Sequence, residues 1–219
     1  MIKKILSYFY PIVLHKENSS TSNLLEVTLY KGKLFLDSKH TNYSYGSLQK
    51  VLRKGLLTIG KEKIQQMNTI LILGVAGGSV VNTLVNDFQF TYSIIGVEID
   101  ENCIKIANDY FGLNQFKNFT CLIDDAENYV HSSTEKFDLL IIDVFKDDKM
   151  PNFLFEKSFV EDCQNILNKK GYIIFNTMLP HNQKELLNQY KLYFPKNKYK
   201  ITQLKKVEKF NDLLIIKST

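Results

Sequence analysis

The sequence has few of the residues that build disulfide frameworks or metal centres. Its 219 residues include 3 cysteines and 4 histidines. Cys103, Cys121 and Cys163 are far apart and form no Cys-x-x-Cys pair, and the histidines do not cluster. This pattern excludes a zinc finger and a small disulfide-rich domain. We expect three reduced cysteines in the interior and no metal site.

Long hydrophobic runs are also missing. No apolar stretch reaches the roughly 20 residues that a transmembrane helix needs. Lys3 and Lys4 precede an apolar run that faintly resembles a secretion signal, but tyrosines and Pro11 interrupt it and no small-residue cleavage site follows. The sequence predicts a short amphipathic helix that ends near Pro11, no membrane partner and a cytoplasmic protein.

Neither sign of charge dominates the chain. It has 28 basic and 23 acidic side chains, a net charge of +5, and 16 of the acids lie between Asp87 and Asp162. The lysine-rich segment from Lys184 to Lys209 shows no interleaved pattern of stacking aromatics and no known nucleic-acid-binding motif. A solvated surface explains these lysines, so no nucleic-acid partner is expected.

The most informative stretch is a predicted β-turn-α-β unit that runs from Thr69 to Asp100. An apolar run leads into a glycine-rich turn, a helix-like segment follows, and a second apolar run ends on an acid. In order, these parts are Ile70–Leu73, Gly74-Val75-Ala76-Gly77-Gly78, Ser79–Asn86, Ile94–Val97 and Glu98. Such a unit is typical of nucleoside-binding domains.

The glycines of this turn lack a Cβ, so a ligand can approach the backbone closely. Glu98 lies twenty residues beyond Gly78, a spacing at which an acid can accept hydrogen bonds from ribose hydroxyls. Val75 and Ala76 interrupt the glycines, so the pattern is not the dinucleotide G-x-G-x-x-G, and S-adenosylmethionine fits better. The alternative is a purely structural turn with Glu98 as a solvated acid.

Period-2 alternation predicts a β-hairpin over 25–36, and a helix is expected over 45–57. From Thr69 onward strands and helices alternate, which predicts an α/β fold with a mostly parallel, Rossmann-like sheet. We therefore expect an N-terminal segment (1–60) and a Rossmann-like domain (61–219). The further predicted strands are 119–123, 137–142, 172–176, 199–204 and 212–216, and the further predicted helices are 101–110, 126–131, 154–167 and 183–190.

Polar residues follow the predicted parallel strands, where ligands of such sheets bind. Asp124 and Asp125 follow one strand, Asp143 follows a fully apolar one, and Asn176 ends the next. A carboxylate after an apolar strand is costly unless it has a partner or a task. Asp125 can accept from an adenine amine, and Ala126 leaves room for the ring.

Each of these acids also has a structural interpretation. The two at 124 and 125 can be N-caps of the following helix, and Asp143 can cap a turn. Asp147 and Asp148 can join Asp143 in an acidic mouth that attracts a cationic substrate or holds Mg²⁺, or they can be solvated loop residues.

Six motifs, in order, carry a family resemblance between Leu25 and Asn176: LEVTLYKGKLFLDS, TNYSYGSLQ, LILGVAGGS, GVEID, IDDAENY and FDLLIIDVF. Together they resemble the polyamine aminopropyltransferase (spermidine synthase) family, within the class I S-adenosylmethionine-dependent methyltransferase fold. The resemblance implies a small N-terminal β-hairpin extension that could pair between subunits as a homodimer.

The resemblance also implies residue roles. Glu98 would bind the ribose, Asp125 and Ala126 the adenine, Asp143 would orient or deprotonate the attacking amine, and Tyr45 would lie beside the donor sulfonium. The catalytic candidates are thus Asp143 and Tyr45. The residues expected to contact S-adenosylmethionine, or its decarboxylated form, are Gly74, Ala76, Gly77, Gly78, Glu98, Ile99, Asp124, Asp125, Ala126 and Asp143.

Three departures separate this chain from the aminopropyltransferases it resembles. Ala76 stands where the family has an acid inside the glycine turn, Gly46 where it has glutamine, and Val144-Phe145-Lys146 follow Asp143 where it has Ser-Ser-Asp. We therefore expect a spermidine synthase-like methyltransferase acting on a small molecule, with a cationic amine among the candidates. The alternatives are a true aminopropyltransferase and a non-catalytic nucleoside-binding protein.

Overall fold

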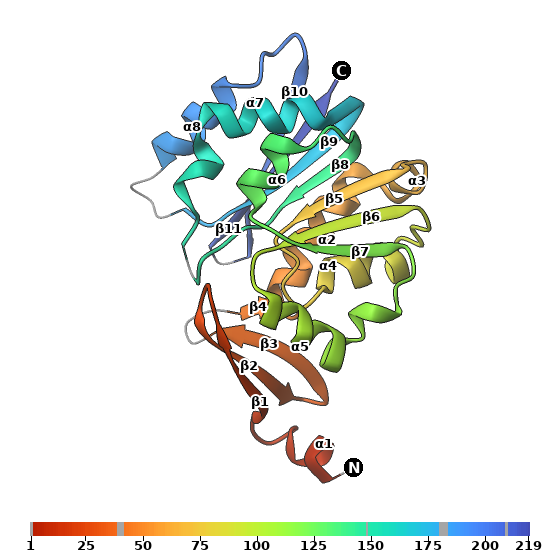
Figure 1. Ribbon diagram of the computed structural model, residues 1–219, viewed down its shortest axis with the longest axis vertical. Helices are drawn as coiled ribbons and strands as arrows, with labels where there is room; N and C mark the ends of the chain where they lie inside the picture. Colours follow the sequence, from red (N-terminus) through yellow and green to blue (C-terminus); the bar gives the residue numbers. More distant parts are fainter. Residues whose placement is uncertain (1, 39–41, 148, 180–183, 209) are drawn as a thin grey trace.

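The computed structural model describes residues 2–38, 42–147, 149–179, 184–208 and 210–219, and it contains two β-sheets (Figure 1). The smaller sheet is antiparallel, in the order β1-β2-β3-β4. Its strands are β1 (Ile12–Ser19), β2 (Asn23–Tyr30), β3 (Lys33–Ser38) and β4 (Asn42–Ser44). Helix α1 (Ile2–Leu6) precedes it, buries no residue and ends well before Pro11.

The N-terminal extension is therefore larger than the predicted hairpin. Strands β2 and β3 form that hairpin, but β1 and β4 add a neighbour on each side. The prediction missed β1 because its sequence, IVLHKENS, has polar residues on both faces and a register shift between Val13 and His15.

The larger sheet has the order β10-β11-β9-β8-β5-β6-β7. The strands from β5 to β9 pair in parallel, and β11 is antiparallel to both of its neighbours. The mostly parallel α/β sheet is thus confirmed. Its strands are β5 (Thr69–Leu73), β6 (Ser93–Glu98), β7 (Phe119–Ile123), β8 (Phe137–Ile142), β9 (Leu167–Thr177), β10 (Tyr199–Glu208) and β11 (Asn211–Ser218).

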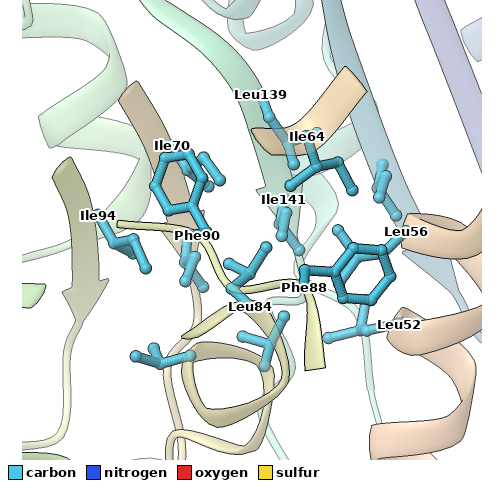
Figure 2. Close-up of a cluster of buried hydrophobic side chains, with 14 of the residues drawn as sticks. Leu52, Leu56, Ile64, Ile70, Leu84, Phe88, Phe90, Ile94, Leu139 and Ile141 are labelled. Carbon is cyan, nitrogen blue, oxygen red and sulfur yellow. The ribbon is translucent and has the colours of Figure 1, made fainter. Parts of the chain in front are cut away.

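Helices cover both faces of this sheet, because its buried strands are apolar on both sides. On β5, Ile70 and Ile72 belong to one apolar cluster while Leu71 and Leu73 belong to the other. Figure 2 shows the first cluster, where Leu52, Leu56 and Ile64 meet sheet residues. Its helices are α2 (Ser47–Ile59), α3 (Lys61–Gln65) and α4 (Ser79–Asn82), which continues as the π-helix η1 (Thr83–Asp87).

The opposite cluster is built by α6 (Ala126–Ser132), the 3₁₀ turn η3 (Asn152–Phe155), α7 (Lys157–Ile166) and α8 (Lys184–Leu192). The expected first residue of α8, Gln183, lies outside the described residues. Helix α2 packs in the core of the large sheet. The predicted division of the chain at residue 60 assigns this helix to the N-terminal segment instead. Among the described residues, no helix is long and apolar enough to cross a membrane.

The predicted bounds between residues 154 and 172 are wrong. The helix expected over 154–167 is divided into η3 and α7, and β9 starts directly at Leu167 instead of at Tyr172. The apolar positions of α7 run on into the strand, so the pattern contains no stop signal. Gly171 lies within β9 and does not end the helix, and a Cβ there would approach the Asn168 carbonyl oxygen to 2.8 Å.

A third apolar cluster joins the small sheet to helix α5 (Glu101–Phe111). Leu25, Val27 and Leu36 of the sheet pack there with Cys103 and Ile106 of the helix, and all five are buried. Cys103 and Cys163 are buried as expected, whereas Cys121 is only partly buried. This packing holds the β1–β2 turn above the carboxyl ends of the parallel strands.

Candidate active site

A cavity of about 740 Å³ lies at the carboxyl ends of the parallel strands. It extends from the ends of β7 and β6, past β5 and β8, to β9 and the β10–β11 hairpin. The structure brings eight predicted site residues to its wall: Gly74, Ala76, Glu98, Ile99, Asp124, Asp125, Ala126 and Asp143. They come from four different strand ends.

At Gly74, the backbone after β5 closely approaches the backbone after β8. The φ of Gly74 is +85°, and a Cβ there would lie 2.3 Å from the backbone oxygen of Asp143. The Gly74 N–H donates to the Val97 carbonyl, and the Asp143 N–H donates to that of Leu73, each at 2.9 Å. The turn is therefore fixed between β6 and β8, and only glycine fits at this position.

The other two glycines of the turn do not line the cavity. A Cβ on Gly77 would lie 2.8 Å from the Cβ of Ser44, and one on Gly78 would lie 2.6 Å from a methyl of Leu113. They face the small sheet and the loop after α5, so the contacts in this structure give them a packing role. Their contact with a cofactor stays a prediction.

Glu98 organises the backbone of the turn. Its Oε2 accepts the N–H groups of Val75 and Ala76 at 3.0 Å each, and its Oε1 accepts those of Ile99 and Asp100 at 3.0 and 3.1 Å. Burial raises the pKa of Glu98 above its ordinary value, while the backbone hydrogen bonds oppose that rise. The carboxylate thus ties the turn to the end of β6 and still reaches the cavity wall.

The acidic turn after β7 has a structural role as well. Asp125 is the N-cap of α6, and its Oδ1 accepts the N–H groups of Glu127 and Asn128 at 2.8 and 3.3 Å. Asp124 accepts the N–H of Asp125 at 2.7 Å. Both acids nevertheless line the cavity beside Ala126. A carboxylate has two oxygens, so capping leaves Asp125 able to accept from a ligand.

Asp143 lines the cavity and is hydrogen-bonded to an amide. Its Oδ1 accepts a hydrogen bond from Asn176 Nδ2 at 2.7 Å, and Asn176 Oδ1 accepts one from Asn211 Nδ2 at 3.0 Å. Burial raises the pKa of Asp143 to about 6, the charge of Glu98 adds to that rise, and the Asn176 hydrogen bond opposes it. Near neutral pH such a carboxyl can both accept and return a proton.

Tyr45, the second catalytic candidate, is not in the cavity wall. Its ring stacks on Phe111 with 4.6 Å between centroids and an interplanar angle of 13°. Burial raises its pKa to about 12. Of the acidic mouth, Asp147 lines the cavity and accepts the Ser38 hydroxyl at 2.7 Å, while Asp148 lies outside the described residues.

Several wall residues were not predicted from the sequence. Ser20 and Thr21 come from the β1–β2 turn, and Met178 follows β9. The loop after β8 adds Phe145, Lys146, Pro151 and Phe153, and the C-terminal hairpin adds Glu208, Phe210 and Asn211. The loop residues follow Asp143 directly, so that strand end was a signal for them. The others belong to no local motif.

A mostly parallel sheet with a glycine turn, three acidic strand ends and a cavity above them is typical of Rossmann-like α/β domains that bind nucleosides. Residues 49–206 match the family model of the spermine/spermidine synthase domain. Because this match covers well over half of the 219 residues, the chain belongs to that family.

Curated relatives are polyamine aminopropyltransferases. The one from Prochlorococcus marinus subsp. pastoris is 28% identical over 178 residues, which are 78% of this chain and 62% of the relative. That of Thermoplasma acidophilum is 32% identical over 117 residues, 52% of this chain and 42% of the relative. The chain thus spans roughly half of the length of these relatives.

Solved structures share the fold at low identity. A probable spermidine synthase from Corynebacterium glutamicum has a TM-score of 0.75 at 15% identity and covers 94% of this chain and 79% of its own. Human methyltransferase-like protein 13 in complex with SAH has a TM-score of 0.66 at 22% identity. The match covers 80% of this chain and 83% of the human chain. The fold is therefore common to both kinds of transferase.

Proposed function

We propose that the protein is a methyltransferase of spermidine synthase-like type, which transfers the methyl group of S-adenosylmethionine to a small molecule. The observation that carries this proposal is the turn from Gly74 to Gly78, which contains no carboxylate. In the aminopropyltransferases that the chain resembles, an acid inside this turn would hold the amine of the decarboxylated donor. The intact donor carries its own carboxylate, and Lys146 in the same cavity wall is a cation that can face it.

The wall residues fit an adenosyl ligand. A cavity of about 740 Å³ falls within the ~300–1,000 Å³ of small-molecule sites. Ile99 and Ala126 offer apolar surface for a base beside Asp125. When bound, the donor would supply an electrophilic methyl group on its sulfonium.

The chain's own residues would then position the acceptor. Asp143 lines the cavity, where its carboxylate can accept the proton of an acceptor N–H or O–H group. Phe145, Phe153 and Met178 would exclude water on the acceptor side. Most of the rate gain would come from holding the acceptor in line with the donor.

Aminopropyl transfer is the second candidate. It is favoured by the acidic residues Asp143, Asp147 and Glu208 of the wall, which suit a cationic amine, and by the names of the curated relatives. Against it stand the turn without an acid and Lys146 after Asp143. A non-catalytic nucleoside-binding protein would bind donor and turn nothing over.

The test uses the purified chain and calorimetry with S-adenosylmethionine, S-adenosylhomocysteine and decarboxylated S-adenosylmethionine. We expect the intact donor to bind at least ten times more tightly than the decarboxylated one. Incubation with amines, followed by mass spectrometry, then distinguishes S-adenosylhomocysteine from 5′-methylthioadenosine as the released product. Spermidine formed from putrescine at an ordinary enzyme rate would establish the second candidate. If none of the three ligands binds, both transferase candidates are ruled out.

A further inference from the structure

Two buried amides connect Asp143 to the C-terminal hairpin. Asn176 is fully buried and Asn211 is 9% exposed. Asn176 donates its NH₂ group to Asp143 and accepts the NH₂ of Asn211 on its own oxygen. An amide turned the other way would set its oxygen against the carboxylate, so the two neighbours fix its orientation.

The three side chains belong to neighbouring strands. Asp143 follows β8, Asn176 is the second-last residue of β9, and Asn211 begins β11. In the register of these strands, Ile142 pairs with Phe175 and Leu213 pairs with Asn176. The hydrogen-bonded row therefore crosses three strands at one edge of the sheet. Asp143 and Asn211 line the cavity, and Asn176 connects them from behind.

We propose that Asn176 and Asn211 are positioning residues, which hold the carboxyl of Asp143 so that one oxygen stays directed at the acceptor. This inference rests on the proposed transferase function. Oδ1 is bonded to Asn176, and within the described part of the chain Oδ2 has no hydrogen-bond partner. Oδ2 is then the oxygen that takes the acceptor proton, and the carboxyl cannot rotate without breaking a bond to a buried amide.

The same row makes Asp143 a stronger acid than burial alone would. The Asn176 hydrogen bond lowers the pKa of Asp143 against the effects of burial and of the Glu98 charge. The other charged groups of the cavity wall are Asp124, Asp125, Lys146, Asp147 and Glu208. Loss of Asn176 should raise the midpoint of the Asp143 titration, and loss of Asn211 should raise it less, because Asn211 acts through Asn176.

The experiment titrates the full chain, labelled with carbon-13 at the aspartate side-chain carboxyls, by NMR. Asn176→Leu should raise the Asp143 midpoint by about one pH unit or more, and Asn211→Ala by a smaller amount. The matched control is Asn168→Leu, because Asn168 also donates to an aspartate, Asp138, at 2.8 Å, but at the other end of β9. It should leave the Asp143 midpoint unchanged.

Two further readouts separate the possible failures. If Asn176→Leu does not fold, Asn211→Ala still decides the question. Asn211 is the first residue of β11, where a smaller side chain disturbs the sheet less. An unchanged Asp143 midpoint in folded Asn176→Leu and Asn211→Ala would overturn the inference. Calorimetry with S-adenosylhomocysteine should give wild-type affinity for the control variant, Asn168→Leu. If the wild type does not bind this ligand, the proposed function fails, while the titration still decides whether the row positions Asp143.

Discussion

At the scale of single residues, Ala76 is the most unusual part of the glycine turn. Its φ is +47°, a region that alanine rarely adopts and that asparagine and aspartate tolerate better. It lines the cavity, so a longer side chain there would reach the ligand. The backbone at this position is therefore already suited to the acid that the chain lacks.

Ala76→Asp should change the donor preference. A carboxylate in the turn would attract the ammonium of decarboxylated S-adenosylmethionine and repel the carboxylate of the intact donor. We expect the affinity ratio, measured by calorimetry, to shift at least tenfold toward the decarboxylated donor. Ala76→Gly is the matched control and should leave the ratio unchanged. An unaltered ratio in the aspartate variant would mean that the donor tail does not lie near this turn.

Gly74→Ala should destabilise the protein far more than Gly60→Ala. Both glycines have positive φ. A Cβ at Gly74 would meet the Asp143 carbonyl oxygen at 2.3 Å, whereas a Cβ at Gly60 would have no heavy atom within 4 Å. We expect a loss of about 3 kcal/mol or more for Gly74→Ala and about 1 kcal/mol for the control, by denaturant unfolding. Equal losses would contradict the close approach of the two strands.

Asp143→Asn should stabilise the protein at neutral pH while it abolishes transfer. The pKa of Asp143 is about 6 in the folded chain and 3.8 in its ordinary state, so the folded form holds the proton more tightly. The associated stability is complete below pH 3.8 and is lost as the pH rises through about 6. The variant should therefore be more stable by about 1–3 kcal/mol at pH 7.5, with the difference closing near pH 4. A constant difference across that range would refute the linkage.

At the scale of elements, the small sheet matters because it is one wall of the site. Its β1–β2 turn brings Ser20 and Thr21 to the cavity, and Ser19 donates to Asp100, the N-cap of α5, at 2.6 Å. The apolar contact with α5 holds the sheet in this position. A weakening of this contact should therefore affect ligand binding as well as stability.

Leu36→Ala should cost about 2–5 kcal/mol, because the side chain is fully buried between the sheet and α5. Val13→Ala is the control, since Val13 is 44% exposed on β1, and it should change stability by under about 0.5 kcal/mol. Urea unfolding and calorimetry with S-adenosylhomocysteine should show that only Leu36→Ala loses stability and affinity together. Unchanged affinity in a folded Leu36→Ala variant would mean that the sheet is not needed for the donor site.

The sequence allowed good prediction of those elements whose signal is local. Strands β7 and β8 have the predicted bounds, because each is a mostly apolar run that polar residues flank on both sides. The same holds for the turn at Gly74 and the acids at the strand ends. Asn211 and Phe210 could not be predicted as wall residues, because they reach the cavity through the pairing of β11 with β9. Ser20 and Thr21 likewise depend on the packing of the small sheet.

At the scale of the whole molecule, a ligand that binds only the folded chain must stabilise it. At 100 times its Kd, S-adenosylhomocysteine should contribute about 2.7 kcal/mol, which for a domain of this size raises Tm by roughly 5–10 °C. Differential scanning calorimetry measures this rise. Adenosine at the same concentration should give a smaller one, because it lacks the amino-acid tail. A Tm that does not change with either ligand would mean that the cavity is not a nucleoside site.

The position of β11 has a consequence for how the protein is made. This strand, residues 211–218, lies inside the sheet between β9 and β10, and its first residue completes the row that ends on Asp143. During synthesis the chain emerges from the ribosome N-terminus first. A nascent chain can therefore form the glycine turn and the acidic strand ends long before it can form a complete site. The cavity wall would be complete only when the residues of β11 have been released.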